Sequence, residues 1–590
     1  MLRGFAMSFT YIASAADWAR IAPELVLAGV ALLVLLVDLL LPQTGSVPRE
    51  RGAANFFVLP LLALLGILGA LAATIALFVV GDGQRAFFGL VGSDWGSLYA
   101  YLAILSAAGL GIIFSPAYLK RLKLVHQGEY YALFLAATLG MMLLAAATSF
   151  MTLFLGLETL SLALYILCGF VTRRQSSQEA GMKYFLLSSF ASAFLLYGVA
   201  LIYGATGTTR FGARGTSAWP GVLQFLQAHP QSTTLLLIGI GLLTVGFAFK
   251  VSAIPFQMWT PDVYEGAPAP VTAFMSVGTK AAALVAFARV FAVVLAPVAA
   301  DWQALVWALA VLTMVGGNVL ALVQRNAKRL LAYSSVAHAG YLLIGVVVGG
   351  TTGLAALLFY LLCYAFLNAG AFGVLSALER LDNGGCDLED LRGLWFRRPW
   401  LAGFLAFFLL ALAGFPPMAG FAAKYYLFLA ALQGGHPELL LIGVLTSVLG
   451  MYYYLRLIAA MFMESARGVV GEAREAAPAL ALASTGGEPR VSGPLGRAAS
   501  TRTGGASSGA AGAALAVKAA PLAAAKRVPV AEQVPETHEQ AAEEEGALAG
   551  GSLSWTTWLG LGLAALGALA LGTVLPFWLV DLALKAAAML

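Results

Sequence analysis

Long apolar runs separated by short polar segments dominate the chain. A helix that crosses a bilayer needs about 20 mostly apolar residues, and fourteen runs meet that requirement. They cover approximately residues 22–42, 57–80, 97–118, 129–147, 149–171, 183–204, 233–254, 270–297, 302–324, 330–349, 353–378, 400–432, 438–463 and 553–580. The pattern predicts an all-α polytopic membrane protein with about 14 transmembrane helices, because a helix satisfies its own backbone hydrogen bonds in lipid.

Prolines predict helix breaks at two of these runs. Pro255 follows the seventh run, and Pro416 and Pro417 lie in the middle of the twelfth. Proline removes a backbone donor and breaks the helical hydrogen-bond pattern. Non-helical backbone at membrane depth is tolerated only where protein or water covers it. Broken helices 7 and 12, one in each half of the chain, are typical of the inverted repeats found in transporters.

The composition agrees with a membrane location. Hydrophobic residues make up 60% of the chain and charged residues 11%, with a mean hydropathy of +0.86, whereas soluble domains carry about 25% charged residues. The net charge of +5 is small for 590 residues and does not indicate nucleic-acid binding. The three cysteines are far apart, and no glycine-rich loop follows a predicted strand. We therefore expect no metal, iron–sulfur or nucleotide site in this chain.

The distribution of basic residues predicts the orientation. The loops after helices 1, 3, 5, 7, 9 and 11 hold 14 Lys and Arg residues, and the loops after helices 2, 4, 6, 8, 10 and 12 hold 3. Basic loops favour the cytoplasmic side. Both termini are therefore predicted to lie outside the cytoplasm.

Several ionisable side chains lie inside apolar runs, where each costs at least about 2.5–3.5 kcal/mol. They are Glu158, Lys183, Lys250, Lys280 and Lys424. Too few carboxylates lie in these runs to pair every lysine. Because an apolar environment disfavours the charged form of an amine, a buried lysine can accept and release a proton near neutral pH. The sequence therefore predicts a proton-translocation path.

Alternatives remain for some of these residues. Lys183 opens its predicted helix and could extend to the membrane interface instead. Glu158 and one lysine could form a purely structural ion pair. His338, about three turns into the tenth helix, could relay protons or simply pack. Asp262 and Glu265 lie in a predicted loop, where they would cap the next helix or line the loop.

Three segments resemble a known family. Residues 249–271 read FKVSAIPFQMWTPDVYEGAPAPV, residues 328–335 read KRLLAYSS and residues 414–421 read GFPPMAGF. They resemble the antiporter-like membrane subunits of respiratory complex I, the proton-pumping NADH:quinone oxidoreductase. The chain looks most similar to the N-type subunits, because it has Thr-Pro-Asp-Val-Tyr from residue 260, Lys280 where relatives usually have histidine, and Lys424 where M-type subunits have glutamate.

The resemblance implies roles by position. Glu158 would modulate Lys250 in broken helix 7, Lys280 would be the central relay residue, and Lys424 would face the periplasmic exit. Lys183 and His338 would be possible further members of the relay.

The resemblance also implies a non-redox subunit of the enzyme, with no complete catalytic site and no cofactor of its own. NADH, FMN, iron–sulfur clusters and quinone would be used by other subunits. M-type and K-type subunits would be its neighbours in the bacterial cytoplasmic membrane. A subunit of a multi-subunit cation/proton antiporter and a structural scaffold are the alternatives.

Four parts of the chain can be distinguished. Residues 1–128 would hold helices 1–3, residues 129–464 an antiporter-like proton-translocating core of helices 4–13, and residues 553–590 the last helix. Residues 465–552 are rich in Ala, Gly, Ser and Pro and have no aromatic residue. Such a segment cannot bury enough apolar surface to offset its ordering entropy. It is predicted to be a disordered cytoplasmic insertion, either a tolerated one or a partner-docking tail.

Overall fold

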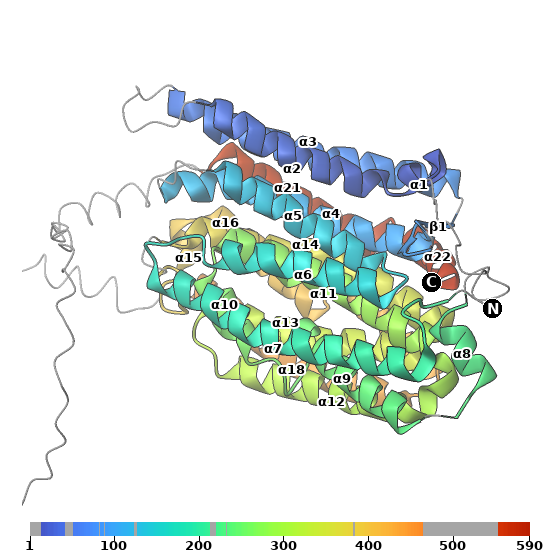
Figure 1. Ribbon diagram of the computed structural model, residues 1–590. Coiled ribbons are helices and arrows are strands. Elements are labelled where there is room, and N and C mark those ends of the chain that lie inside the picture. The colour runs from blue at the N-terminus through green and yellow to red at the C-terminus, as the bar shows by residue number, and fades with distance from the viewer. Residues whose placement is uncertain are drawn as a thin grey trace, which may run out of the picture. The chain divides into compact units, whose positions relative to one another are not determined.

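The computed structural model describes residues 13–41, 51–81, 83–87, 89–122, 127–212, 220–231, 233–380, 384–463 and 553–590. The insertion predicted at 465–552 lies outside them. The residues before and after this insertion, up to 464 and from 553 on, form one compact unit. Its described part is almost entirely helical, and the long helices run side by side (Figure 1).

The helices before the first break are α1 (Ala15–Arg20), α2 (Ala22–Leu40), α3 (Arg51–Val80), α4 (Trp95–Arg121), α5 (Gly128–Ala145), α6 (Phe150–Cys168), α7 (Gln175–Thr206), α8 (Val222–Ala228) and α9 (Thr234–Val251). The central ones are α10 (Trp259–Gly266), α11 (Ala269–Ala288), α12 (Ala299–Leu322), α13 (Ala327–Val348) and α14 (Gly350–Leu378). The last are α15 (Leu394–Arg397), α16 (Pro399–Ala413), α17 (Ala419–Gln433), α18 (Pro437–Phe462), α21 (Trp555–Thr573) and α22 (Pro576–Met589). A short hairpin pairs β1 (Arg85–Ala86) antiparallel with β2 (Val91–Gly92).

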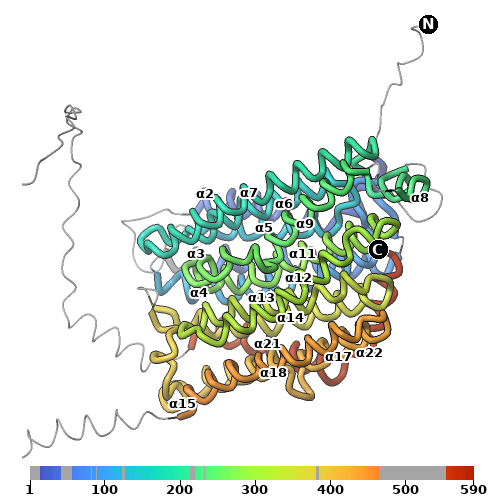
Figure 2. The backbone as a smooth tube through the Cα atoms, turned by 90° about the horizontal axis from the view of Figure 1, so that it is seen from below, coloured from blue at the N-terminus to red at the C-terminus, as the bar shows by residue number. Residues whose placement is uncertain are grey.

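The predicted fold class is confirmed. Among the described residues, 13 helices are long and apolar enough to cross a membrane. The predicted twelfth crossing is present as two half-helices, α16 and α17. Most residues of the spans in α4, α11, α13 and α14 are buried, whereas no more than a third of those in α2, α3, α18 and α21 are. Figure 2 shows α13 and α14 running through the middle of the bundle and α18 along one edge. A helix that is apolar all round can occupy either environment, so only packing separates the two groups.

Both predicted breaks are present. After α9, Ser252 has a left-handed backbone with φ of 66°, and the backbone N–H of Ile254 donates to the Thr313 hydroxyl at 3.0 Å. After α16, Gly414 also turns left-handed, with φ of 96°, a conformation that suits glycine. Protein groups thus cover backbone that the breaks leave without helical partners, as a membrane interior requires.

Three predicted boundaries were wrong. The helix that contains Lys183 begins at Gln175, so Lys183 lies in its third turn rather than at its start. Residues 259–266 form α10 instead of a loop; Pro261 falls in its first turn, where a missing N–H costs little. The last predicted helix is two helices, because α22 starts at Pro576 and proline favours the beginning of a new helix.

Helices α5 and α6 approach each other closely at two glycines. A Cβ atom on Gly140 would lie 2.4 Å from the backbone nitrogen of Leu160, and one on Gly156 would lie 2.5 Å from that of Leu144. We expect Gly140→Ala to push the helices apart and to cost about 1–3 kcal/mol of stability. Thermal unfolding of the purified complex measures this. Gly241→Ala is the control, since no atom lies within 4 Å of its added Cβ, and equal midpoints for both variants would contradict the prediction.

Candidate proton-translocation site

Lys250 lies near the end of α9, directly before the first break, and only 2% of it is exposed. Its Nζ donates to the Ser161 hydroxyl of α6 at 2.7 Å and to the Tyr184 hydroxyl of α7 at 3.3 Å. Neither partner carries a charge. The amino group is therefore held by groups that can themselves give or take a proton through hydrogen bonds.

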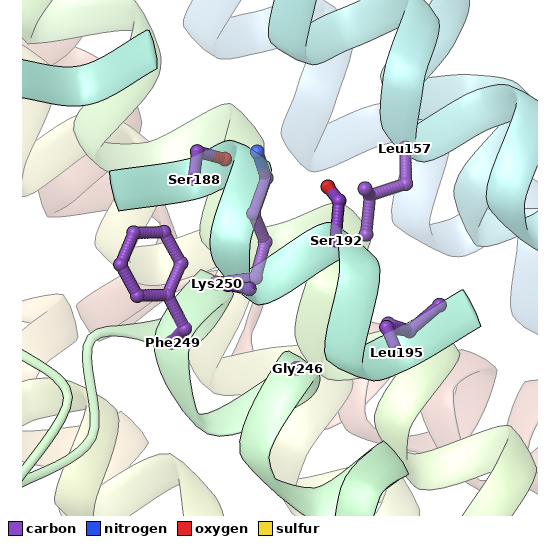
Figure 3. Close-up of a pocket in the computed structure, with 8 residues that line it drawn as sticks. Leu157, Ser188, Ser192, Leu195, Gly246, Phe249 and Lys250 are labelled. Atoms are coloured by element: carbon purple, nitrogen blue, oxygen red, sulfur yellow. The ribbon is translucent and has the colours of Figure 1, made fainter. Parts of the chain in front are cut away.

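A small cavity of about 10 Å³ adjoins Lys250, with room for one water molecule. Figure 3 shows the amino group of Lys250 between the hydroxyl-bearing side chains of Ser188 and Ser192, which both come from α7. Leu157 and Phe249 supply part of its apolar wall. The cavity leaves Lys250 a small space beside hydroxyl groups in an otherwise packed interior.

Glu158 lies on α6, one turn before Ser161. Its Oε1 is buried and has no hydrogen-bond partner among the described residues. The hydrogen bonds of Lys250 go to hydroxyl groups and not to this carboxylate. The fold thus brings Glu158 to the same region as Lys250, at the helix face that holds the lysine's partner Ser161.

Lys280 lies in the centre of α11, with 1% exposure. Its Nζ contacts the carbonyl oxygen and the hydroxyl of Ser335 on α13, both at 2.5 Å. Both are neutral groups.

Lys424 lies in α17, just after the second break, and is 7% exposed. Its Nζ donates to the carbonyl of Ala413, the last residue of α16, at 3.0 Å. It also lies 5.4 Å from the ring centre of Tyr341. The break therefore supplies the lysine with a backbone oxygen that an intact helix would have used internally.

His338 belongs to a hydrogen-bonded group between these two lysines. Its Nδ1 lies 2.7 Å from the Tyr360 hydroxyl and its Nε2 lies 3.3 Å from the Tyr454 hydroxyl. Tyr454 also shares a hydrogen bond with Ser334, the residue before the Lys280 partner Ser335. His338 is thus both packed and part of a hydrogen-bonded chain that reaches Ser334, the sequence neighbour of Ser335 on α13.

Comparison with known proteins places the chain in a family. The family described as NADH:quinone oxidoreductase/Mrp antiporter, TM, matches residues 147–450. The NADH-quinone oxidoreductase subunit N of Trichlorobacter lovleyi is 46% identical over 444 residues, covering 75% of this chain and 87% of the relative. The subunit N 2 of Roseiflexus castenholzii is 43% identical over 467 residues, covering 77% and 89%. The chain belongs to the NADH-quinone oxidoreductase subunit N family.

Solved structures agree with this membership. A chain of respiratory complex I from Thermus thermophilus with bound Aureothin is 37% identical and has a TM-score of 0.59, covering 75% of this chain and 90% of that one. A chain of the Mrp complex from Dietzia sp. has a TM-score of 0.68 over 97% of both chains, but at 22% identity it shows the fold alone.

As a subunit N family member, the chain is a proton-translocating membrane subunit of NADH:quinone oxidoreductase, a multi-pass protein that works with other membrane subunits of complex I. Within the described part of the chain, no group of three or more His, Cys, Asp or Glu side chains is placed to hold a metal ion.

Lys183 differs from the buried lysines of this chain. Its side chain is 40% exposed and forms ion pairs with Glu179 and Asp262, each at 2.7 Å. Asp262 also pairs with Arg329 at 2.8 Å, and Glu265 pairs with the same guanidinium at 2.8 Å. Burial alone would raise the pKa of Asp262, but hydrogen bonds from Lys183 and Arg329 outweigh it and lower the pKa below its usual value.

Asp262 and Glu265 were expected to cap the following helix or to line a loop. Helix α11 follows Pro268 and has no side-chain cap, and both acids lie on α10. The capping expectation was therefore wrong, since their carboxylates instead tie α10 to α7 and α13.

Three of the hydroxyl groups at this site were not predicted from the sequence. Ser161, Tyr184 and Tyr454 lie in apolar runs and read as ordinary packing residues. A usable signal was present in the tyrosines, because a buried phenol needs a hydrogen-bond partner and so tends to lie near other polar groups.

Proposed function

We propose that Glu158, Lys250, Lys280 and Lys424 form the proton relay of this subunit. The observation that supports this most is that the three lysines are almost fully buried and are hydrogen-bonded to hydroxyl and carbonyl groups. A carboxylate in contact would stabilise each lysine in its protonated form. Neutral partners stabilise the charge less, so the ammonium group can release its proton. An intramembrane lysine of this kind is suited to proton transfer.

In this proposal the proton moves from Lys250 to Lys280 and then to Lys424. Glu158 acts on Lys250 through its charge, so a shift of either group changes how firmly the lysine holds its proton. His338 joins the path through the Tyr454 hydroxyl between Lys280 and Lys424. Lys183 serves at the outer edge of the path, where its ion pairs and exposure keep it charged.

The proposal places the subunit in the bacterial cytoplasmic membrane, with both termini on the periplasmic side and Lys424 toward the periplasmic exit. M-type and K-type subunits are its neighbours. Residues 129–464 form the translocating core, flanked by helices 1–3 and the last crossing. The chain acts as part of a translocase without redox chemistry of its own; NADH, FMN, iron–sulfur clusters and quinone belong to other subunits.

Reconstituting the purified complex in sealed vesicles tests this function. We expect NADH and quinone to drive acidification of the lumen when the NADH site faces outward, with the same rate in sodium-free and sodium-containing buffer. Sodium-dependent proton exchange without NADH would instead support a cation/proton antiporter. A complex that oxidises NADH without moving protons would contradict the proposal.

A further inference from the structure

Glu379 is a fully buried carboxylate at the end of α14, outside the proposed relay. Its side chain is 0% exposed. Oε1 accepts hydrogen bonds from Arg174 Nη1 at 2.8 Å and from Lys328 Nζ at 3.0 Å, and Oε2 accepts one from the backbone N–H of Ala269 at 3.1 Å. Buried charges are tolerated when they are paired and hydrogen-bonded. This one carboxylate compensates two buried cations that come from different elements, the start of α7 and the first turn of α13.

Lys328 uses its remaining donors at the end of α10. Its Nζ donates to the carbonyl oxygens of Glu265 at 2.6 Å and Ala267 at 2.9 Å. An ammonium group has three N–H donors, so the two carbonyls and Glu379 use them all. The last carbonyls of a helix lack partners within the helix, and Lys328 satisfies them here. The position of Lys328 therefore fixes the end of α10.

Helix α10 in turn contacts the surroundings of Lys250 through Trp259. The indole Nε1 donates to the carbonyl oxygen of Phe249, the residue before Lys250, at 3.1 Å. The indole ring also stacks on Tyr184, with ring centres 4.7 Å apart and planes 8° from parallel. Tyr184 is one of the two hydroxyl partners of Lys250. The position of α10 thus influences the position of the backbone beside Lys250 and that of Tyr184, which accepts one hydrogen bond from the lysine's amino group.

We propose that Glu379 is a positioning residue for the proton path: its carboxylate holds Lys328 against the end of α10, and α10 holds Lys250 in register with Tyr184. This inference rests on the proposed role of Lys250. Without the carboxylate, Arg174 and Lys328 are two buried cations that repel each other. Lys328 then leaves the carbonyls of α10, and Trp259 moves with the helix.

The test uses Glu379→Gln in the whole complex, reconstituted in vesicles, with proton pumping measured per assembled complex. We expect pumping to fall at least about tenfold, since small misplacements of transfer groups have effects of that size. Glu389→Gln is the matched control, because this exposed carboxylate lies ten residues further on. A purely structural role would lower the amount of complex and leave its pumping unchanged. Equal pumping per complex in both variants would overturn the proposal.

Two compensated variants keep the test decisive if Glu379→Gln does not assemble. Combining it with Arg174→Gln or with Lys328→Gln removes one of the two cations, so either pair restores the charge balance. Only the pair with Arg174→Gln keeps the Lys328 cap on α10. We expect that pair alone to recover pumping, and recovery in both or in neither would overturn the proposal.

Lys250→Met, measured beside these variants, separates this proposal from the relay itself. Normal pumping in Lys250→Met would refute the role of Lys250 on which this inference rests. A pumping defect in Lys250→Met together with normal pumping in Glu379→Gln would refute the positioning role alone.

Discussion

Complexes that carry Lys250→Met or Lys280→Met are expected to assemble and to lose proton pumping coupled to NADH oxidation. Methionine fills a similar volume, so the packing of the buried site is preserved. It cannot take up a proton, and placing that charge elsewhere at membrane depth costs at least about 2.5–3.5 kcal/mol. A barrier raised by that amount slows transfer roughly a hundredfold. The measurement is the rate of lumen acidification per assembled complex in vesicles.

Lys120→Met is the control for these variants. Lys120 is exposed in the last turn of α4, so replacing it removes the same charge without touching the buried groups. Its pumping rate is expected to equal that of the wild type. If Lys250→Met and Lys280→Met both pumped at the wild-type stoichiometry, the lysine relay would be wrong.

Arg289→Met is expected to cause the largest loss of stability. Arg289 forms a two-pronged ion pair with Asp94, with distances of 2.7 Å and 3.0 Å, and donates to the Ser97 hydroxyl at 2.8 Å. Asp94 caps the start of α4 and is 7% exposed. Burial alone would raise the pKa of Asp94, but the charge and hydrogen bonds of Arg289, together with hydrogen bonds from Ser97, outweigh it and lower the pKa, so the carboxylate stays charged. Removing one partner of a buried pair costs about 3–5 kcal/mol.

Thermal unfolding of the purified complex at neutral pH measures that loss. Arg289→Lys is the matched variant: it keeps the charge but cannot make the two parallel bonds, so its midpoint should lie between those of Arg289→Met and the wild type. An unchanged midpoint in Arg289→Met would show that Asp94 finds another partner and that the pair contributes little.

The membrane spans and the two breaks could be predicted because their signals are local. A run of about 20 apolar residues is visible in any short window, and Pro255 and the Pro416–Pro417 pair predict helix breaks by their residue type alone, although α3 and α4 continue through Pro60 and Pro116. The free-energy cost of placing an ionisable side chain in lipid likewise distinguishes Lys250, Lys280 and Lys424 as candidate functional residues. The motifs around the breaks carried the family resemblance, which the relatives confirmed.

The partners of those charges could not be predicted, because they come from helices distant in sequence. Lys250 meets Ser161 across 89 residues, and Arg174 meets Glu379 across 205. Hydropathy shows that each helix has an apolar surface, but it does not specify which other helix packs against that surface. Only packing decides that Lys183 forms surface ion pairs while Lys250 does not.

Local sequence features were therefore enough to identify a membrane protein with two broken helices, intramembrane lysines and the motifs of one family. How those lysines are held depends on contacts between distant helices. The tertiary structure also turned residues 259–266 into a helix and gathered Arg174, Lys328 and Glu379 into one buried cluster. The physical reason is that insertion cost depends on each residue and its near neighbours, whereas pairing of charges depends on which helix faces meet.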